Sequence, residues 1–195
     1  DAQHADDVEI VEHAMRQVLD AELPGEIVSR SAYRGDFQMH STWSDGAESL
    51  PLMIEGCAAL GQTCLGITDH SHGLPIAKGM SMETVAAQHA EIDALNSGLA
   101  GRFWVFKGVE ANIQADGTLD LAPDDRRQFE FVVAAPHAKL RRTEDQTGRM
   151  LAAVSAPWIA MLGHPRGRVF DTRGGVQCDW PRIFAVAAER GVAVE

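Results

Sequence analysis

The segment CLGITDHS, residues 64–71, shows the pattern from which the fold can be inferred. A short apolar run typical of a buried strand ends in an acid and a histidine, Asp69 and His70. Residues 81–95 then have the pattern of a helix, with Ser81 as a suitable N-cap. A strand followed by a helix is the unit from which parallel α/β sheets are built.

The same unit recurs on both sides of this segment. The expected strands are short and apolar and lie at residues 33–40, 63–68, 102–113, 129–135, 158–162 and 192–195. The expected helices alternate with them and lie at residues 48–60, 81–95, 143–154 and 180–190. This order predicts an α/β protein with a largely parallel sheet. It fits an open doubly wound sheet and a closed βα barrel equally well, because hydrophobic periodicity does not separate the two.

The chain length bounds the domain organisation. With 195 residues, 45% of them hydrophobic, the chain is expected to form one main domain. An amphipathic helix is predicted at residues 6–22, so residues 1–34 are expected to be a helical extension or linker and residues 35–195 the domain. The last apolar run, GVAVE, stops at Glu195, so this domain is expected to be incomplete at its C-terminal end.

Charge and cysteine usage restrict the partners and the compartment. The net charge of −11 argues against a broad basic groove for nucleic acid, although bound metal ions would change the balance where they sit. Cys57, Cys64 and Cys178 form no CxxC pair, which favours buried free thiols and a cytoplasmic location. No apolar run approaches the roughly 18 residues of a membrane span, so no membrane partner is expected.

Side chains that bind metals recur where the expected strands end. They are His40 with Asp45 in the loop that follows, His70, Glu110, His137 and His164. Chance would place roughly half a histidine at such positions, given strands of this length. Four of the chain's eight histidines occupy them.

The carboxyl ends of parallel strands open on one face, so these side chains should converge. Imidazoles mixed with carboxylates suit zinc, manganese or iron, and such metals activate water for attack on phosphoryl or carbonyl groups. Taken singly, a histidine after a strand is more often a loop or core residue, and Asp45 in SDG is a typical turn residue. Six such residues at equivalent positions favour a shared metal centre.

Five segments in order carry a resemblance to a known family. They are GDFQMHSTWSDG (35–46), LGITDHS (65–71), KGVEANIQADGTLDL (107–121), FVVAAPH (131–137) and LGHPRGR (162–168). Together they resemble the polymerase-and-histidinol-phosphatase (PHP) family of metal-dependent phosphoesterases. The similarity is strongest to the PHP module of bacterial family X DNA polymerases and its stand-alone relatives.

The resemblance implies a distorted (β/α)7 barrel with two to three divalent ions, Zn, Mn or Fe. Its implied ligands are His40, Asp45, His70, Glu110, His137 and His164. Glu110 would bridge two ions, Glu110 and His137 would be catalytic, and a hydroxide between the ions would attack a phosphate ester. The substrate would be a phosphorylated small molecule or a nucleic-acid 3′ end, and the enzyme a phosphatase or 3′–5′ exonuclease. The acidic net charge favours the first substrate and the family similarity the second.

Two positions depart from the family pattern. Gln38 stands where the first motif usually has histidine, and a carboxamide offers only a weaker, neutral oxygen ligand. The final D-x-H motif on the seventh strand has no counterpart before Glu195. Both departures keep open a non-catalytic PHP-type scaffold with a degraded site. An amidohydrolase-type enzyme acting on C–N bonds is a third, less favoured alternative, because its barrel lysine is not identifiable.

Several cations are candidates for contact with substrate. Lys78, in the loop after the second strand, and Arg166, just past His164, are candidates to hold substrate phosphate, although ordinary solvated surface charge is the favoured interpretation of each. Lys139, Arg141 and Arg142 form a basic cluster after the fourth strand. A solvated helix start is the favoured interpretation of that cluster, and contact with a nucleic-acid backbone is the alternative.

Overall fold

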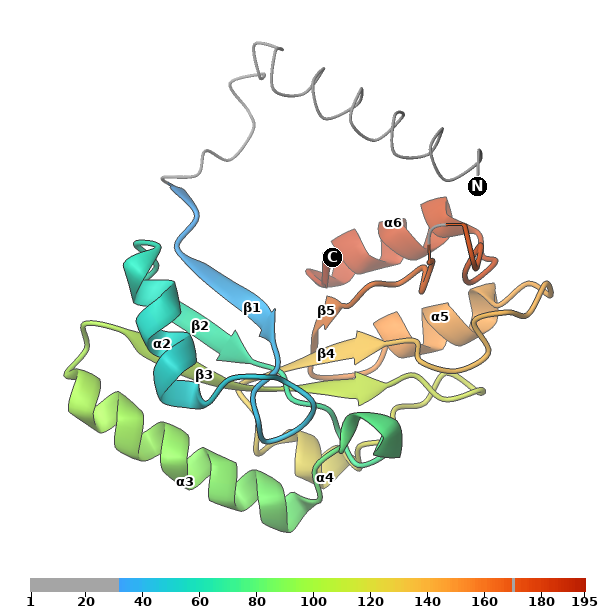
Figure 1. Cartoon of the computed structure of the whole chain (residues 1–195). Coiled ribbons are helices and arrows are strands. Elements are labelled where there is room, and N and C mark those ends of the chain that lie inside the picture. Colours follow the sequence, from blue (N-terminus) through green and yellow to red (C-terminus); the bar gives the residue numbers. More distant parts are fainter. Residues whose placement is uncertain (1–31, 170) are drawn as a thin grey trace, which may run out of the picture. The chain divides into compact units, whose positions relative to one another are not determined.

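A six-stranded sheet organises the part of the chain that the computed structural model describes, residues 32–169 and 171–195 (Figure 1). The strands are β1 (Gly35–Met39), β2 (Cys64–Ile67), β3 (Trp104–Asn112), β4 (Phe131–Ala135), β5 (Ile159–Leu162) and β6 (Ala193–Val194). Every neighbouring pair is parallel. The helix predicted at residues 6–22 lies outside the described residues.

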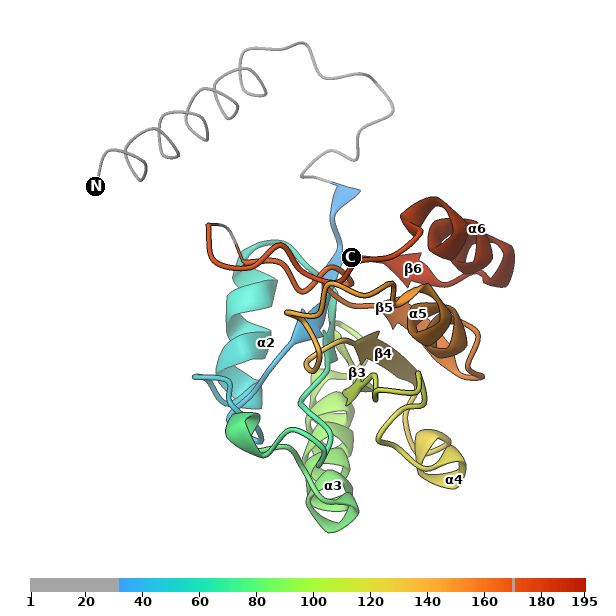
Figure 2. The same ribbon diagram turned by 90° about the vertical axis from the view of Figure 1, so that its right-hand side faces the viewer.

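The strand order separates the two topologies that periodicity left open. The strands follow one another across the sheet in sequence order, β1 to β6. A doubly wound sheet would instead reverse its strand order at a switch point. The sheet also curls, as a comparison of Figures 1 and 2 shows. The α/β prediction is therefore confirmed, and the curled half-barrel agrees with a partial (β/α) barrel.

Helices connect the strands as expected, with some different ends. They are α2 (Leu50–Ala59), the 3-10 helix η2 (Pro75–Ala77), α3 (Met82–Leu99), α4 (Pro123–Arg126), α5 (Thr147–Val154) and α6 (Trp180–Arg190). The expectation for residues 81–95 was too short, because Asn96 on α3 is buried and exchanges two hydrogen bonds of 2.9 Å with the backbone of Val105. The expected start at 143 was too early, because Asp145 accepts hydrogen bonds from the backbone N–H and the hydroxyl of Thr147.

Two apolar clusters attach the helices to the sheet. One joins β3, β4 and β5 to α5 and α6 and includes Val132, Met150 and Ile183. The other joins β2 and β3 to α2 and α3 and includes Leu50 and Leu65. All five side chains are fully buried, and burial of each contributes about 1.5–3 kcal/mol. The strand ends that carry the polar side chains therefore rest on a packed base.

An aromatic group fills the concave face of the sheet below the strand ends. The ring of Phe131 on β4 packs edge-on against that of Phe37 on β1, with their centroids 5.8 Å apart. Gly66 and Gly108 make room for it, because a methyl group at either position would overlap the Phe131 ring. Glu110 lies two residues beyond Gly108 on β3 and therefore projects from the same face.

The cysteines and the helices bear on two further expectations. Cys57 is buried, whereas Cys64 and Cys178 are only half-buried, so the expectation of three buried thiols was wrong for two of them. All three are free of disulfides. Within the described ranges, no helix has the length and apolar character needed to cross a membrane.

Candidate metal centre

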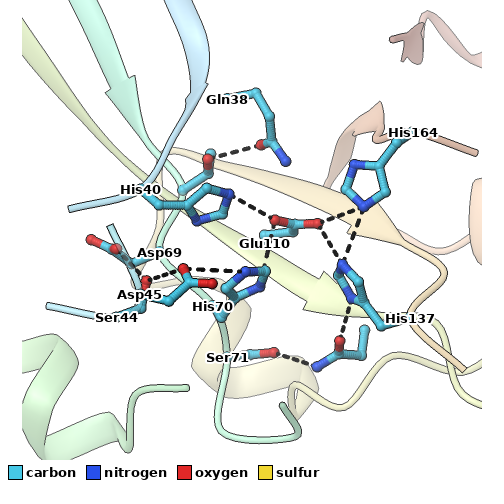
Figure 3. A network of polar contacts seen from close by, with 12 residues as sticks. Gln38, His40, Ser44, Asp45, Asp69, His70, Ser71, Glu110, His137 and His164 are labelled. Carbon is cyan, nitrogen blue, oxygen red and sulfur yellow. Dashed lines mark hydrogen bonds and ion pairs between the residues drawn. The ribbon is translucent and has the colours of Figure 1, made fainter. Parts of the chain in front are cut away.

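Side chains from five successive strands meet around one buried carboxylate, that of Glu110 (Figure 3). Glu110 Oε2 lies 3.2 Å from His40 Nε2 and 3.5 Å from His70 Nδ1. Glu110 Oε1 lies 3.1 Å from both His137 Nε2 and His164 Nε2. The Glu110 side chain is 0% exposed, so water does not solvate its charge.

The contacts around Glu110 leave polar atoms without hydrogen bonds. Neither oxygen of Glu110 receives a hydrogen bond of acceptable geometry, and the Nδ1 atoms of His40 and His70 also have no partner. A buried carboxylate without donors is costly. Imidazole nitrogens and carboxylate oxygens that face one another in this way form a donor set that a divalent cation would satisfy. These residues therefore fit the metal that the family resemblance implies.

Two adjoining groups of ligand atoms are close enough to share a cation. One is His40, Asp45 and His70, and the other is His70, Glu110 and His137. Within each group the atoms lie within 4.8 Å of one another. Asp45 is the exposed member, and its Oδ1 lies 3.6 Å from His70 Nε2. His164 lies beside the second group, with its Nε2 3.1 Å from His137 Nε2. The six predicted residues are thus brought together, and their role as ligands stays a prediction.

The charge of Glu110 controls the protonation of its neighbours. Burial raises the pKa of the Glu110 carboxyl, but contacts with His137, His164 and His40 outweigh burial and hold that pKa below its usual range. Burial lowers the pKa of His40, yet Glu110 more than compensates and the His40 pKa is raised. Contact with Glu110 also raises the pKa of His164. Burial dominates at His70, whose pKa is lowered.

A second buried carboxylate, Asp69, holds the loop that carries Asp45. Asp69 accepts hydrogen bonds from the backbone N–H of Ser41 at 2.8 Å and from its hydroxyl at 2.6 Å. It also accepts from the Ser44 hydroxyl at 2.5 Å and from Gln88 Nε2, on α3, at 2.6 Å. Its lone pairs are used by these donors, so it fixes the geometry of the first loop and is not available as a ligand.

A third polar network orients the ring of His137. His137 Nδ1 lies 2.5 Å from Asn112 Oδ1, while Asn112 Nδ2 donates to Asp120 at 2.5 Å and to Ser71 Oγ at 3.2 Å. The amide oxygen only accepts, so His137 Nδ1 carries a proton, and Nε2 is the ring nitrogen that faces Glu110. Partners of this kind fix the tautomer of metal-binding histidines. Asp120 has a structural place in this network, since it accepts hydrogen bonds from Asn112 and Ser71.

Glu195 was not identified as a site residue from the sequence. Its Oε2 accepts a 2.6 Å hydrogen bond from the backbone N–H of His164 and lies 3.3 Å from His164 Nδ1. The signal that found the other residues was present here as well, since Glu195 is the acid that follows β6. Asn112 gave no comparable signal, because an amide beside a strand end has no special meaning without its spatial neighbours.

Three other residues named from the sequence lie outside both ligand groups. The carbonyl oxygen of Gln38 accepts a 2.8 Å hydrogen bond from the Thr68 hydroxyl. Lys78 is exposed and follows the last residue of η2, with its backbone in the left-handed conformation. The guanidinium of Arg166 lies over the Trp180 ring, 5.4 Å from its centroid. The roles proposed for Lys78 and Arg166 in binding substrate stay predictions.

Comparison with known proteins indicates the same chemical class. No protein-family model matches the chain. The chain is 36% identical over 171 residues to the DNA polymerase/3′-5′ exonuclease PolX of Bacillus subtilis, a match that covers 87% of this chain and 30% of that protein. It is 31% identical over 95 residues to a probable phosphatase of Caldicellulosiruptor bescii, covering 47% of this chain and 37% of that protein.

These matches support a coarse assignment. The chain spans 30% and 37% of the length of these two curated relatives. Both names describe enzymes that hydrolyse phosphate esters. They suggest a PHP-like phosphoesterase and point to a hydrolase.

Proposed function

We propose that this chain is a metal-dependent phosphoesterase module of PHP type, acting as a phosphatase or a 3′–5′ exonuclease. One observation carries the proposal. The fully buried Glu110 faces four imidazoles from four different strand ends, and neither of its oxygens has a hydrogen-bond donor. Such a group of lone pairs is costly in a structural core and suits divalent cations.

Six residues of this centre would bind the metal ions. His40, Asp45, His70, Glu110, His137 and His164 would hold two to three ions of Zn, Mn or Fe. When bound, such ions supply Lewis-acid chemistry: they lower the pKa of water and stabilise negative charge on phosphoryl oxygens.

The chain's own residues prepare this binding. Glu110 contributes a desolvated negative charge in the middle of the histidines, which strengthens its attraction for cations. The hydrogen bond to Asn112 keeps a lone pair on His137 Nε2. Asp69 keeps the first loop, and with it Asp45, beside His70. The substrate phosphate would approach from the exposed side, where Asp45 and His164 reach the surface with exposed fractions of 44% and 41%.

Hydrolysis by the full-length protein tests the proposal. With Mn²⁺, it should cleave p-nitrophenyl phosphate, bis-p-nitrophenyl phosphate or the 3′ end of a labelled single-stranded oligonucleotide, and EDTA should abolish the activity. Loss of one outer partner of a ligand costs about 10–100-fold in activity or affinity, so Glu110→Gln, which alters a central ligand, should cost at least that. An exposed histidine next to the site, in His72→Gln, is the matched control. Absence of turnover on all three substrates would overturn the proposal.

The scaffold alternative has one specific observation in its favour. The oxygen of Gln38 already accepts a hydrogen bond from Thr68, so the first motif offers one strong ligand fewer than the family pattern. A scaffold would bind fewer than two ions tightly per full-length chain, whereas the phosphoesterase should bind at least two. Metal analysis after gel filtration discriminates between the two.

A further inference from the structure

A cationic groove adjoins the candidate metal centre at His137. It is a hollow of about 410 Å³ lined by His137, Lys139, Leu140, Arg141, Arg142 and Arg173. Among the polar residues that line this hollow, His137 is a candidate metal ligand and all the others carry positive charge. We use the name cationic groove for the surface formed by Lys139, Arg141, Arg142 and Arg173.

The groove continues away from the metal centre. A neighbouring hollow of about 270 Å³ shares Arg141, Arg142 and Arg173 with it. A third, of about 340 Å³, shares Arg173 and adds Arg168, together with the single carboxylate Asp171. The positive surface therefore extends from His137 along the loops that precede α5 and α6.

The cations of the groove form no close ion pairs with described residues, although the exposed acids Glu144 and Asp145 follow in the same loop. None of the ion pairs in the described part of the chain includes Lys139, Arg141, Arg142 or Arg173. Arg141 and Arg173 donate only to backbone carbonyls, those of Thr172 and Gly167, at 3.4 and 2.6 Å. In a chain of net charge −11, four unpaired cations around one hollow form a local attraction for anions.

Hydrogen bonds from α5 and from the residue before it hold the backbone of the loop that carries Lys139. Arg149 on α5 is buried and donates to the carbonyls of Ala138, at 2.9 Å, and Gln114, at 2.7 Å. Gln146 donates to the Lys139 carbonyl at 3.1 Å. The sequence interpretation of Lys139, Arg141 and Arg142 as a helix start was wrong, because α5 begins only at Thr147, but their side chains are exposed to solvent as expected.

We propose that the cationic groove binds a second phosphate group of the substrate, covalently linked to the phosphate that is hydrolysed. The inference rests on the proposed function, since it takes the hydrolysed phosphate to lie at the centre around Glu110. Arginine suits this task, because its planar guanidinium donates two parallel hydrogen bonds to a phosphate. Two sources share this chemistry: the next phosphodiester of a single nucleic-acid strand, and the second phosphate of a small bisphosphorylated molecule.

Binding measurements test the groove independently of hydrolysis. The probe is a fluorescein-labelled dT octamer with hydrolysis-resistant phosphorothioate linkages, followed by anisotropy with Mn²⁺ and again in EDTA. The Arg141→Gln/Arg142→Gln variant changes two exposed side chains, so the fold should persist. Its binding should weaken, and the slope of log K against log salt should fall by about 1.4, at 0.7 per lost phosphate contact on a single strand.

The matched control removes two arginines at the opposite end of the strands. Arg102 precedes β3 and Arg127 precedes β4, so both lie before strands whose far ends carry the metal centre. Arg102→Gln/Arg127→Gln has the same net charge as the groove variant and should bind the probe as the unaltered protein does. Equal binding by the two double variants, or failure of both the probe and a nucleoside 3′,5′-bisphosphate to bind the unaltered protein, overturns the proposal.

Competition identifies the source of the second phosphate. Displacement of the probe by a nucleoside 3′,5′-bisphosphate at concentrations where the 5′-monophosphate fails supports a small bisphosphorylated substrate. Displacement only by unlabelled oligonucleotides supports a nucleic-acid strand as the substrate. Displacement by the 5′-monophosphate as strong as that by the bisphosphate overturns the proposal that the groove binds a second phosphate. If hydrolysis of all three substrates fails while groove binding persists, the proposed function fails and the anion site stands.

Discussion

Glu110 is the residue on which the candidate centre depends. Its carboxylate is fully buried and lies within 3.5 Å of four imidazole nitrogens. Mutation to glutamine keeps the shape of the side chain and removes its charge, so the histidines lose the anion that draws a cation among them.

We expect Glu110→Gln to retain substantially less Mn²⁺ than the unaltered protein after gel filtration. The measurement is metal content per chain by mass spectrometry, with His72→Gln as the control for loss of an exposed imidazole. Equal metal content in Glu110→Gln and the unaltered protein would contradict the placement of Glu110 at the centre.

Asn112 is a second single residue on which the centre depends, because it contacts the ring of His137. Its amide oxygen fixes the His137 tautomer, and the effect of such a partner on metal affinity is about 10–100-fold. We expect Asn112→Ala to lower Mn²⁺ affinity within that range without changing the number of ions bound at saturation. Titration calorimetry measures both quantities, and an unchanged affinity would show that the hydrogen bond is not used in this way.

At the scale of elements, the loop after β1 depends on a residue that follows β2. Asp69 accepts four hydrogen bonds, which join that loop to α3. We expect Asp69→Ala to lower the free energy of unfolding by about 3 kcal/mol, because hydrogen bonds to a charge contribute about 1.5–3 kcal/mol and the donors left behind are buried. Urea unfolding measures the change.

A surface aspartate provides the control for this element. The Asp124 side chain is 92% exposed and lies 3.9 Å from Arg127. Asp124→Ala should change stability by at most about 0.5 kcal/mol. A comparable loss in both variants would mean that the Asp69 network contributes nothing specific.

The same elements show how far the sequence could predict this structure. The strand ends that carry the candidate ligands were predictable, because short apolar runs stopped at histidines or acids such as His70 and Glu110. The end of α3 was not, since Asn96 is retained in the helix by bonds to a strand that only the fold brings near. The network around Asn112 was hidden for the same reason, because it joins residues from three separate segments.

At the scale of the whole molecule, the sequence left the closure of the sheet open, because every strand of a βα barrel and of an open sheet carries the same apolar pattern. The order β1 to β6, without a reversal, decided between them. Stability should also respond globally to metal and pH, since the candidate ligands come from five strands.

We expect stabilisation by Mn²⁺ to increase from pH 6 to pH 8. Glu110 raises the pKa of His40 and His164, so in the metal-free protein these contacts stabilise the fold fully below the ordinary histidine pKa of about 6.5. That contribution is lost as the pH rises through the raised values. The lowered pKa of His70 has the opposite effect on the free energy of unfolding, because burial of the neutral ring favours the folded state as the pH rises. Metal ions need unprotonated imidazoles, so their affinity for the protein rises between pH 6 and pH 8.

Thermal unfolding with Mn²⁺ and with EDTA at pH 6, 7 and 8 measures this difference. The gap between the two unfolding temperatures should widen as the pH rises, because ligand binding to the native state adds to its stability. A gap that is constant or narrows with pH would show that the histidines do not bind the metal.

The unbroken strand order also governs how the protein reaches its folded state. Each strand of the sheet is hydrogen-bonded to the one that precedes it in the chain, so the strand pairings close short loops, and we expect the sheet to be able to grow by one βα unit at a time. Each added unit brings one more candidate ligand, whereas the two ends of the ligand series, His40 and His164, meet at Glu110 only after β5 has joined. We therefore expect the group around Glu110 to be complete only late in folding, whereas His40, Asp45 and His70 can come together once β1 and β2 have paired.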